Sequence, residues 1–177
     1  NNAPPTVRAN ETQVMVSEGQ TVTTSGVYAD VAEDVVSLAS SVGIIVDNGD
    51  GTWAWSHTVA DGPTDSQSVT VTAMDEDGGT ATTTFELVVE NLPPTVSVNT
   101  ATVSLFEGQT AVNSGQYSDV PADTVSLTAS VGQVVDQQDG TWSWSFATTD
   151  GPEESQSVVI TATDEDGSSS TVSFDLT

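Results

Sequence analysis

The feature that most constrains this chain is a duplication of its own sequence. Identical segments recur with one constant offset of 89 residues and no gap: PPTV (4–7 and 93–96), EGQT (18–21 and 107–110) and DGTW (50–53 and 139–142). A shared offset over most of a chain is the signature of two copies of one folding unit. We therefore expect a first repeat over residues 1–90 and a second over 91–177. The two prolines of VENLPPT (89–95) suit a connector, because proline is excluded from central strands.

Within each repeat the hydrophobic residues alternate with a period of two. TWSWSF (141–146) places Trp142, Trp144 and Phe146 on one face and Thr and Ser on the other, which is typical of a half-buried strand. Turn signals rich in Gly, Asp and Pro separate such segments, so each repeat is expected to be an all-β sandwich of about seven strands. In the first repeat the expected strands are 6–16, 20–27, 35–40, 43–47, 52–58, 67–74 and 80–89.

The aromatic residues and the one histidine point to packing rather than to chemistry. Exposed tryptophans could stack on a sugar, but their alternation with Ser and Thr favours a core position. His57 aligns with Phe146 in the second repeat, which favours a half-buried position at the end of a strand. Without Cys or Lys, and with a single His, a nucleophilic catalytic group is not supported. We expect no enzyme.

The charge of the chain is strongly negative. It has 26 acidic residues, one basic residue (Arg8) and a formal net charge of −25. Nucleic acid and anionic membranes are disfavoured as partners because like charges repel, and no apolar run is long enough to span a membrane. Cations are favoured instead. Acidity that serves only solubility, as in halophilic proteins, is the alternative.

The acidic residues gather in the expected loops. MDEDGG (74–79) returns as TDEDGS (163–168), and in a sandwich with alternating strand directions this turn shares a pole with the loop YADVAED (28–34). The acids Asp34 and Asp50, with Asp123 and Asp139 in the second repeat, are expected near the same poles. The expected metal ligands are Asn2, Asp30, Asp75 and Asp77 at the first pole, Glu18 and Asp61 at the opposite pole, and Asn91, Asp119, Asp164 and Asp166 in the second repeat.

Oxygen ligands from several loops, without His or Cys, suit a hard cation. Ca²⁺ accepts six to eight oxygens in flexible geometry, whereas Mg²⁺ requires a tighter octahedron. Ca²⁺ is therefore the expected cofactor, and Mg²⁺ the second choice. An ordinary hairpin turn remains the alternative for each DEDG segment, because Asp and Gly are common turn residues.

NLPPTVSV, EGQT, GQYSDVPADTVSL, DGTWSWS and VVITATDEDGSSSTVSFDL together resemble the bacterial PKD-like and cadherin-like immunoglobulin-type repeats of large surface proteins. This resemblance implies a seven-stranded immunoglobulin-like sandwich, tandem arrays on secreted proteins, and calcium at the linker pole. By the same resemblance, Glu18 is similar to the loop glutamate that reaches an inter-repeat calcium. TATDEDG is similar to the aspartate-bearing turn of such repeats.

The expected function is structural. The chain would be a spacer, stalk or adhesin shaft of a secreted bacterial surface protein, with calcium rigidifying the junction between repeats. One alternative is a self-assembling subunit of an extracellular filament or surface layer. Another is a module that binds a cell-surface glycan or protein. The chain has no initiator Met and no signal peptide, so it is expected to be part of a longer extracellular protein in which neighbouring repeats are partners.

Overall fold

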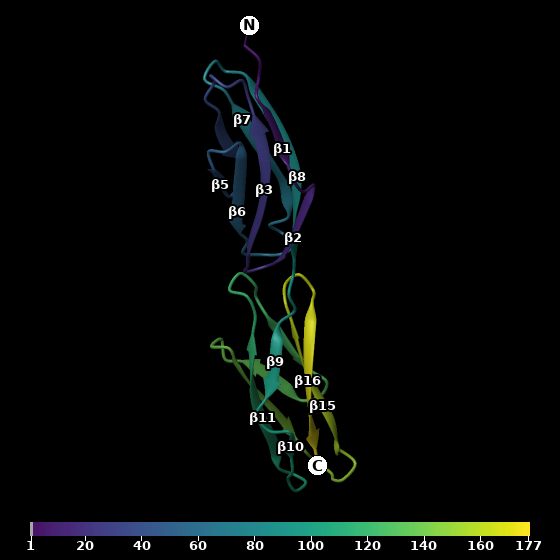
Figure 1. Cartoon of the computed structure of the whole chain (residues 1–177). Coiled ribbons are helices and arrows are strands. Elements are labelled where there is room, and N and C mark those ends of the chain that lie inside the picture. The colour runs from purple at the N-terminus through teal and green to yellow at the C-terminus, as the bar shows by residue number, and fades with distance from the viewer. Residues whose placement is uncertain (1) are drawn as a thin grey trace. The chain divides into compact units, whose positions relative to one another are not determined.

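The computed structural model describes residues 2–177, which divide into two compact units, residues 2–91 and Leu92–Thr177. Sixteen strands make up the regular structure (Figure 1). None of the described residues belongs to a helix long and apolar enough to cross a membrane. The all-β architecture with two sandwiches is confirmed.

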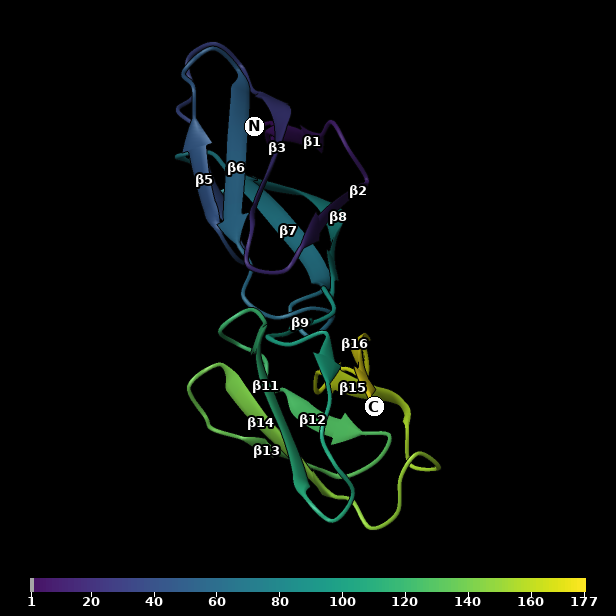
Figure 2. The same cartoon turned by 90° about the horizontal axis from the view of Figure 1, so that it is seen from below.

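Unit 1 consists of two four-stranded sheets. One has the order β1-β3-β6-β5 and the other β2-β8-β7-β4, and the two layers are visible in Figure 2. The strands are β1 (Thr6–Ala9), β2 (Gln13–Ser17), β3 (Thr21–Ala29), β4 (Ser37–Ser40), β5 (Ile44–Asp47), β6 (Thr52–Thr58), β7 (Gln67–Met74) and β8 (Thr80–Glu90).

The expectation of one strand over 6–16 is wrong, and the burial of two valines gives the reason. Val7 and Val14 are both buried. They are seven residues apart, so an unbroken strand would point them to opposite faces. The chain instead breaks after Ala9 and changes sheet. β1 pairs antiparallel with β3, and β2 pairs parallel with β8. Each unit therefore has eight strands where about seven were expected.

The core of unit 1 lies between the sheets and is built around Trp53 and Trp55, which are 0% and 1% exposed. The ring of Trp55 meets Phe85 edge-on at 5.0 Å, and its Nε1 donates to the Val42 carbonyl oxygen at 2.8 Å. The prediction of buried tryptophans is confirmed. His57 is half-buried at the end of β6, with its ring 6.0 Å from that of Trp55.

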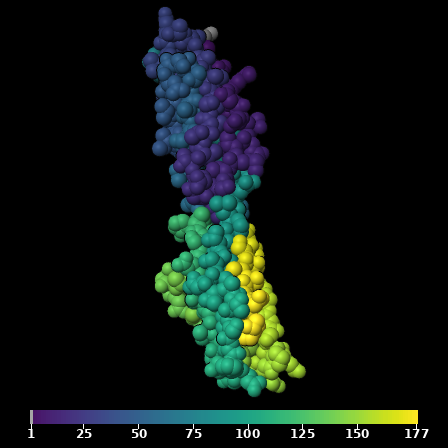
Figure 3. Space-filling model, turned by 60° about the horizontal axis from the view of Figure 1, so that its bottom comes forward, coloured from purple at the N-terminus to yellow at the C-terminus, as the bar shows by residue number. Residues whose placement is uncertain are grey.

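Unit 2 repeats the two sheets, in the orders β13-β14-β11-β9 and β10-β16-β15-β12. Its strands are β9 (Thr95–Val98), β10 (Thr102–Val103), β11 (Thr110–Ser118), β12 (Ser126–Ala129), β13 (Gln133–Asp136), β14 (Thr141–Ala147), β15 (Gln156–Thr163) and β16 (Ser169–Leu176). The outer face of β16 is open to solvent (yellow in Figure 3). Its parallel partner β10 has only two residues, whereas β2 in unit 1 has five.

Two local features recur in both units. A Cβ placed on Gly26 would overlap the Arg8 carbonyl oxygen and the Trp53 ring, and Gly115 is in the matching position. The Tyr28 hydroxyl donates to Asp47 at 2.7 Å, which ties β3 to the end of β5. The same bond is made in unit 2 by residues Tyr117 and Asp136 at 2.6 Å.

Candidate metal sites

Three aspartates meet at one pole of unit 1. Asp30 directly follows β3, Asp34 lies in the loop between β3 and β4, and Asp75 directly follows β7. One carboxylate oxygen from each lies within 4.8 Å of the others. Because β3 and β7 belong to different sheets, the group joins the two layers of the sandwich where their strands end.

The surroundings of these three carboxylates favour the binding of a positive charge. Asp75 is 3% exposed. Its Oδ2 accepts from the Asn2 amide at 2.8 Å, and its Oδ1 accepts from the Gly79 backbone N–H at 2.7 Å. The Asn2 hydrogen bond lowers the pKa of Asp75 and keeps it ionised. Burial raises the pKa of Asp34, and the neighbouring carboxylates, Asp30 first, raise it further.

Asp30 supplies an oxygen that lacks a partner within the described part of the chain. Its Oδ1 accepts from the Val31 backbone N–H at 2.8 Å. Its Oδ2 is buried and has no hydrogen-bond partner among residues 2–177. A buried carboxylate oxygen without a donor is costly, so a ligand that supplies positive charge would lower the free energy of the folded state.

In unit 2 an equivalent group of three aspartates is formed by the residues 89 positions later in the sequence. Oxygens of Asp119, Asp123 and Asp164 lie within 4.8 Å of one another. Asp164 is 5% exposed, and its Oδ1 accepts from the Ser168 N–H at 2.8 Å. Asp119 accepts from the N–H of Val120 at 2.9 Å, as Asp30 does from Val31. Two independent sets of loops thus converge on one arrangement.

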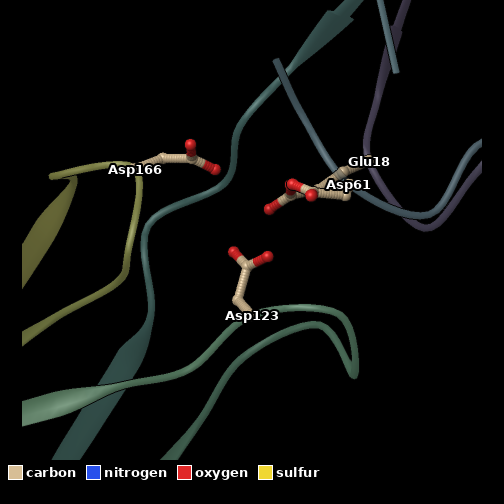
Figure 4. A group of neighbouring side chains, drawn as sticks. All are labelled: Glu18, Asp61, Asp123 and Asp166. Carbon is tan, nitrogen blue, oxygen red and sulfur yellow. The ribbon is translucent and has the colours of Figure 1, made fainter. Parts of the chain in front are cut away.

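A second acidic pair lies at the opposite pole of unit 1. Glu18, between β2 and β3, and Asp61, between β6 and β7, have carboxylate oxygens within 4.8 Å of each other (Figure 4). Glu18 is fully buried and accepts from the Gly62 N–H at 2.9 Å. Asp61 Oδ1 is buried without a hydrogen-bond partner in the described chain. Asn91 follows β8 at this pole, where a Cβ built on Gly62 would lie 3.0 Å from the Asn91 backbone nitrogen.

The remaining acidic residues have other positions. Asp77 is exposed and lies outside the group of three, although its charge raises the pKa of Asp34. Asp166, its counterpart in unit 2, is also exposed and has an oxygen within 4.8 Å of one from Asp123 (Figure 4). Asp50 holds its own turn, because Oδ1 accepts from both the backbone N–H and the hydroxyl of Thr52.

Asp34 and Asp123 were expected at these poles but not as ligands. The structure places both within the groups. The available signal was their spacing, since each follows the first aspartate of its loop by four residues in YADVAED and YSDVPAD. A loop has no periodicity that would show whether such a residue turns inward.

Residues 1–88 match the bacterial Ig domain family. No curated protein sequence matches the chain. Among solved structures, titin domains Z1Z2 in complex with telethonin are 19% identical with a TM-score of 0.55, over 99% of this chain and 96% of that one. Titin domains A168-A170 are 14% identical with a TM-score of 0.57, over 97% of this chain and 65% of that one. At these identities the likeness shows the immunoglobulin-like fold alone.

Proposed function

We propose that the chain is a calcium-stabilised spacer. Residues 1–88 match the bacterial Ig domain family, and residues 92–177 repeat much of that sequence and its fold. In this role the two units are structural repeats of a secreted bacterial surface protein, a stalk or adhesin shaft. Calcium bound at the poles of the sandwiches holds their loops in place.

The observation that carries the proposal is the duplicated aspartate group. Three carboxylates whose oxygens lie within 4.8 Å of one another repel, because like charges this close interact unfavourably even near the protein surface. The chain offers a single Arg or Lys side chain to offset 26 acids. A bound cation removes this repulsion, and it binds the folded loops better than the unfolded chain. It therefore stabilises by mass action, by about 2.7 kcal/mol per site when free ion is at 100 times its dissociation constant.

The ligand chemistry favours calcium over other metals. The groups contain only carboxylate oxygens, with no His or Cys, which is the set that hard cations prefer. The residues come from several different loops, which suits the irregular coordination of Ca²⁺ better than the strict octahedron of Mg²⁺. Backbone carbonyl oxygens and water would complete the coordination.

A second ion would bind at the pole where the chain leaves unit 1. Glu18 and Asp61 offer carboxylates at the pole where the chain exits β8, and Asn91 is the first residue beyond that strand. An ion held by these side chains would restrict the backbone at the start of the connector. Calcium would then stiffen the chain between the repeats as well as the repeats themselves.

The direct test is thermal unfolding of the whole chain in EDTA, in millimolar Ca²⁺, and in Mg²⁺ at equal ionic strength. We expect Ca²⁺ to raise the melting temperature by several degrees, since about 1 kcal/mol shifts the melting temperature of a domain of this size by roughly 4–8 °C. Mg²⁺ should do much less. The Asp30→Asn and Asp119→Asn substitutions should each remove part of the Ca²⁺ effect.

The matched control is Glu86→Gln, which removes one charge from the exposed face of β8 and lies outside the acidic groups. It should leave the Ca²⁺ response unchanged. If Ca²⁺ and Mg²⁺ raise the melting temperature equally, and Glu86→Gln behaves like Asp30→Asn, the acids act only through general charge screening and the proposal fails.

A further inference from the structure

The turn between β5 and β6 combines residues whose chemistry the proposed metal sites do not use. Its sequence is DNGDG (47–51), in which Asn48 is directly followed by Gly49. Asn48 is the only asparagine of the chain with a glycine after it. The side-chain amide of an asparagine can be attacked by the backbone nitrogen of the next residue. Glycine permits this attack most readily, because it has no side chain to obstruct the approach.

The Asn48–Gly49 pair lies at the surface of unit 1. Both residues are exposed, and a Cβ built on Gly49 would meet no atom within 4 Å. The φ of Gly49 is +77°, as in many tight hairpin turns. Water and hydroxide therefore reach the Asn48 amide and the Gly49 N–H without any unfolding of the sandwich.

Hydrogen bonds within the turn restrain the reactive groups. The Asn48 Nδ2 donates to Thr52 Oγ1 at 2.8 Å, and the Gly49 N–H donates to Asp47 Oδ1 at 2.8 Å. The second bond holds the proton that Gly49 must lose before its nitrogen can attack. Asp47 Oδ1 also accepts from the Tyr28 hydroxyl, which keeps this carboxylate in place. The rate of attack is therefore governed by the opening of the bond between Asp47 and Gly49.

We propose that Asn48 is a site of spontaneous deamidation. The Gly49 nitrogen gives its proton to hydroxide and forms a bond to Cγ of Asn48. The bond from Cγ to Nδ2 breaks, and this nitrogen takes a proton from water and leaves as ammonia, which regenerates the hydroxide. Water then opens the five-membered imide at either carbonyl. The products are aspartate and isoaspartate, in which the main chain passes through the former side-chain carbon.

Unit 2 contains the same turn without the reactive pair. Gln137 and Gln138 stand at the matching positions. The N–H of Gln138 donates to Asp136 Oδ1 at 2.8 Å, and its φ is 62°, so the backbone resembles that of the turn in unit 1. A glutamine side chain is one carbon longer, and its attack would have to come from a residue that carries a side chain. Deamidation should therefore be confined to unit 1.

The other asparagines lack at least one of the conditions met at Asn48. Asn113 is 8% exposed, and its Nδ2 donates to the Thr100 carbonyl oxygen at 2.9 Å. Asn10 and Asn99 are exposed, but a glutamate follows the first and a threonine the second. These side chains obstruct the backbone nitrogen that would have to attack.

The reaction changes the turn in charge and in length. An aspartate at position 48 places a third carboxylate between Asp47 and Asp50. An isoaspartate adds one carbon to the main chain, and it lengthens the turn that sets Asp47 opposite Trp53 in the register of β5 and β6. Unit 1 would therefore lose stability as the molecule ages, whereas this reaction would leave unit 2 unchanged.

The test is incubation of the full chain in EDTA in a mildly alkaline buffer, with proteolysis and mass spectrometry at successive times. We expect the peptide that carries Asn48 to gain the mass difference between an amide and an acid, and to separate into aspartate and isoaspartate forms. Peptides that carry Asn113 or Gln137 should keep their mass. Isomerisation of Asp50 changes no mass, so it is distinguished from the proposed reaction. The proposed metal sites are empty in EDTA, so the result is independent of the calcium proposal.

Variants of the turn separate the steps of the reaction. Asn48→Gln, which copies the residue of unit 2, should abolish the mass gain. Gly49→Ala keeps the asparagine but obstructs the attack, and it should slow the mass gain by about tenfold. Asp47→Ala frees the Gly49 N–H and should accelerate it. The matched control is Asn99→Gln, which alters an exposed asparagine elsewhere and should leave the rate unchanged.

The results that would overturn the proposal are equally specific. One is an Asn48 amide that remains intact long after the free peptide VDNGDGT, residues 46–52, has been fully converted. Another is a mass gain that Asn48→Gln does not remove, or that Gly49→Ala does not slow. A slower reaction in Asp47→Ala would overturn the restraining role of its hydrogen bond to Gly49.

Discussion

At Gly26 the backbone of β3 lies directly against the Arg8 carbonyl oxygen and the ring of Trp53, so there is no space for a side chain. Gly49 has the opposite character. Its φ is +77°, but a Cβ there would meet no atom within 4 Å. Gly26 is therefore required by the lack of space around it, and Gly49 by its backbone conformation.

We expect Gly26→Ala to destabilise unit 1 by about 3 kcal/mol or more, because β1 or Trp53 must move to admit the methyl group. Gly49→Ala should cost only about 1–2 kcal/mol, the penalty for an L-residue in the left-handed region. Urea unfolding of both variants followed by Trp fluorescence would measure the difference. Equal costs for the two would contradict the proposed role of close packing at Gly26.

The protonation of the Tyr117 hydroxyl is coupled to folding. Its hydrogen bond to Asp136, together with burial and the charge of Asp136, raises the pKa of Tyr117 from 10.0 to about 12. The folded state thus keeps a proton that the unfolded state loses. The stabilisation is complete below pH 10 and is lost as the pH rises toward 12.

Absorbance titration of tyrosinate in the folded protein should show a group with a midpoint of about 12, which Tyr117→Phe removes. The substitution should cost about 1 kcal/mol at neutral pH, and it should flatten the fall in stability between pH 10 and 12. A midpoint near 10 for Tyr117 would show that the bond to Asp136 does not persist in solution.

At the scale of elements, the strands with clean alternation could be predicted from sequence. β6 and β7 begin and end where expected, since Trp53, Trp55, Val69 and Val71 mark their buried faces. The first strand could not be placed correctly by polarity alone. The strand is interrupted because Val14 belongs to a different sheet from Val7. The sheet that contains Val14 is determined by the pairing of β2 with β8, which local sequence does not show.

The candidate metal sites show the same limit. The turn at Asp75 and the loop at Asp30 could be assigned to one pole, because strand direction alternates along the chain. The inward position of Asp34 could not be assigned, because the loop between β3 and β4 has no repeating pattern. Strand periodicity predicts which loops meet, whereas the side chains that converge depend on the backbone path of each loop.

At the scale of the whole molecule, the two units share a fold but not the same core. Val22 and Val59 are buried in unit 1, and Ala111 and Thr148 stand at the matching positions of unit 2. Unit 2 therefore buries less apolar side chain, and each lost buried group weakens a core.

We expect unit 1 to be the more stable unit in EDTA. Hydrogen exchange followed by mass spectrometry should show amides of β15 exchanging roughly tenfold or more faster than those of β7, its counterpart in unit 1, since each 1.4 kcal/mol of opening free energy is a factor of ten. Equal exchange of the two strands would mean that the smaller side chains of unit 2 are fully compensated elsewhere.

The parallel pairing of β2 with β8 has a further consequence for a chain that is pulled. β2 lies near the start of unit 1, β8 ends it, and they run in the same direction. Tension applied to the two ends of the unit would slide these strands past each other, so that all their hydrogen bonds bear load together instead of opening one at a time. Under tension unit 1 would therefore keep its length until these hydrogen bonds break together.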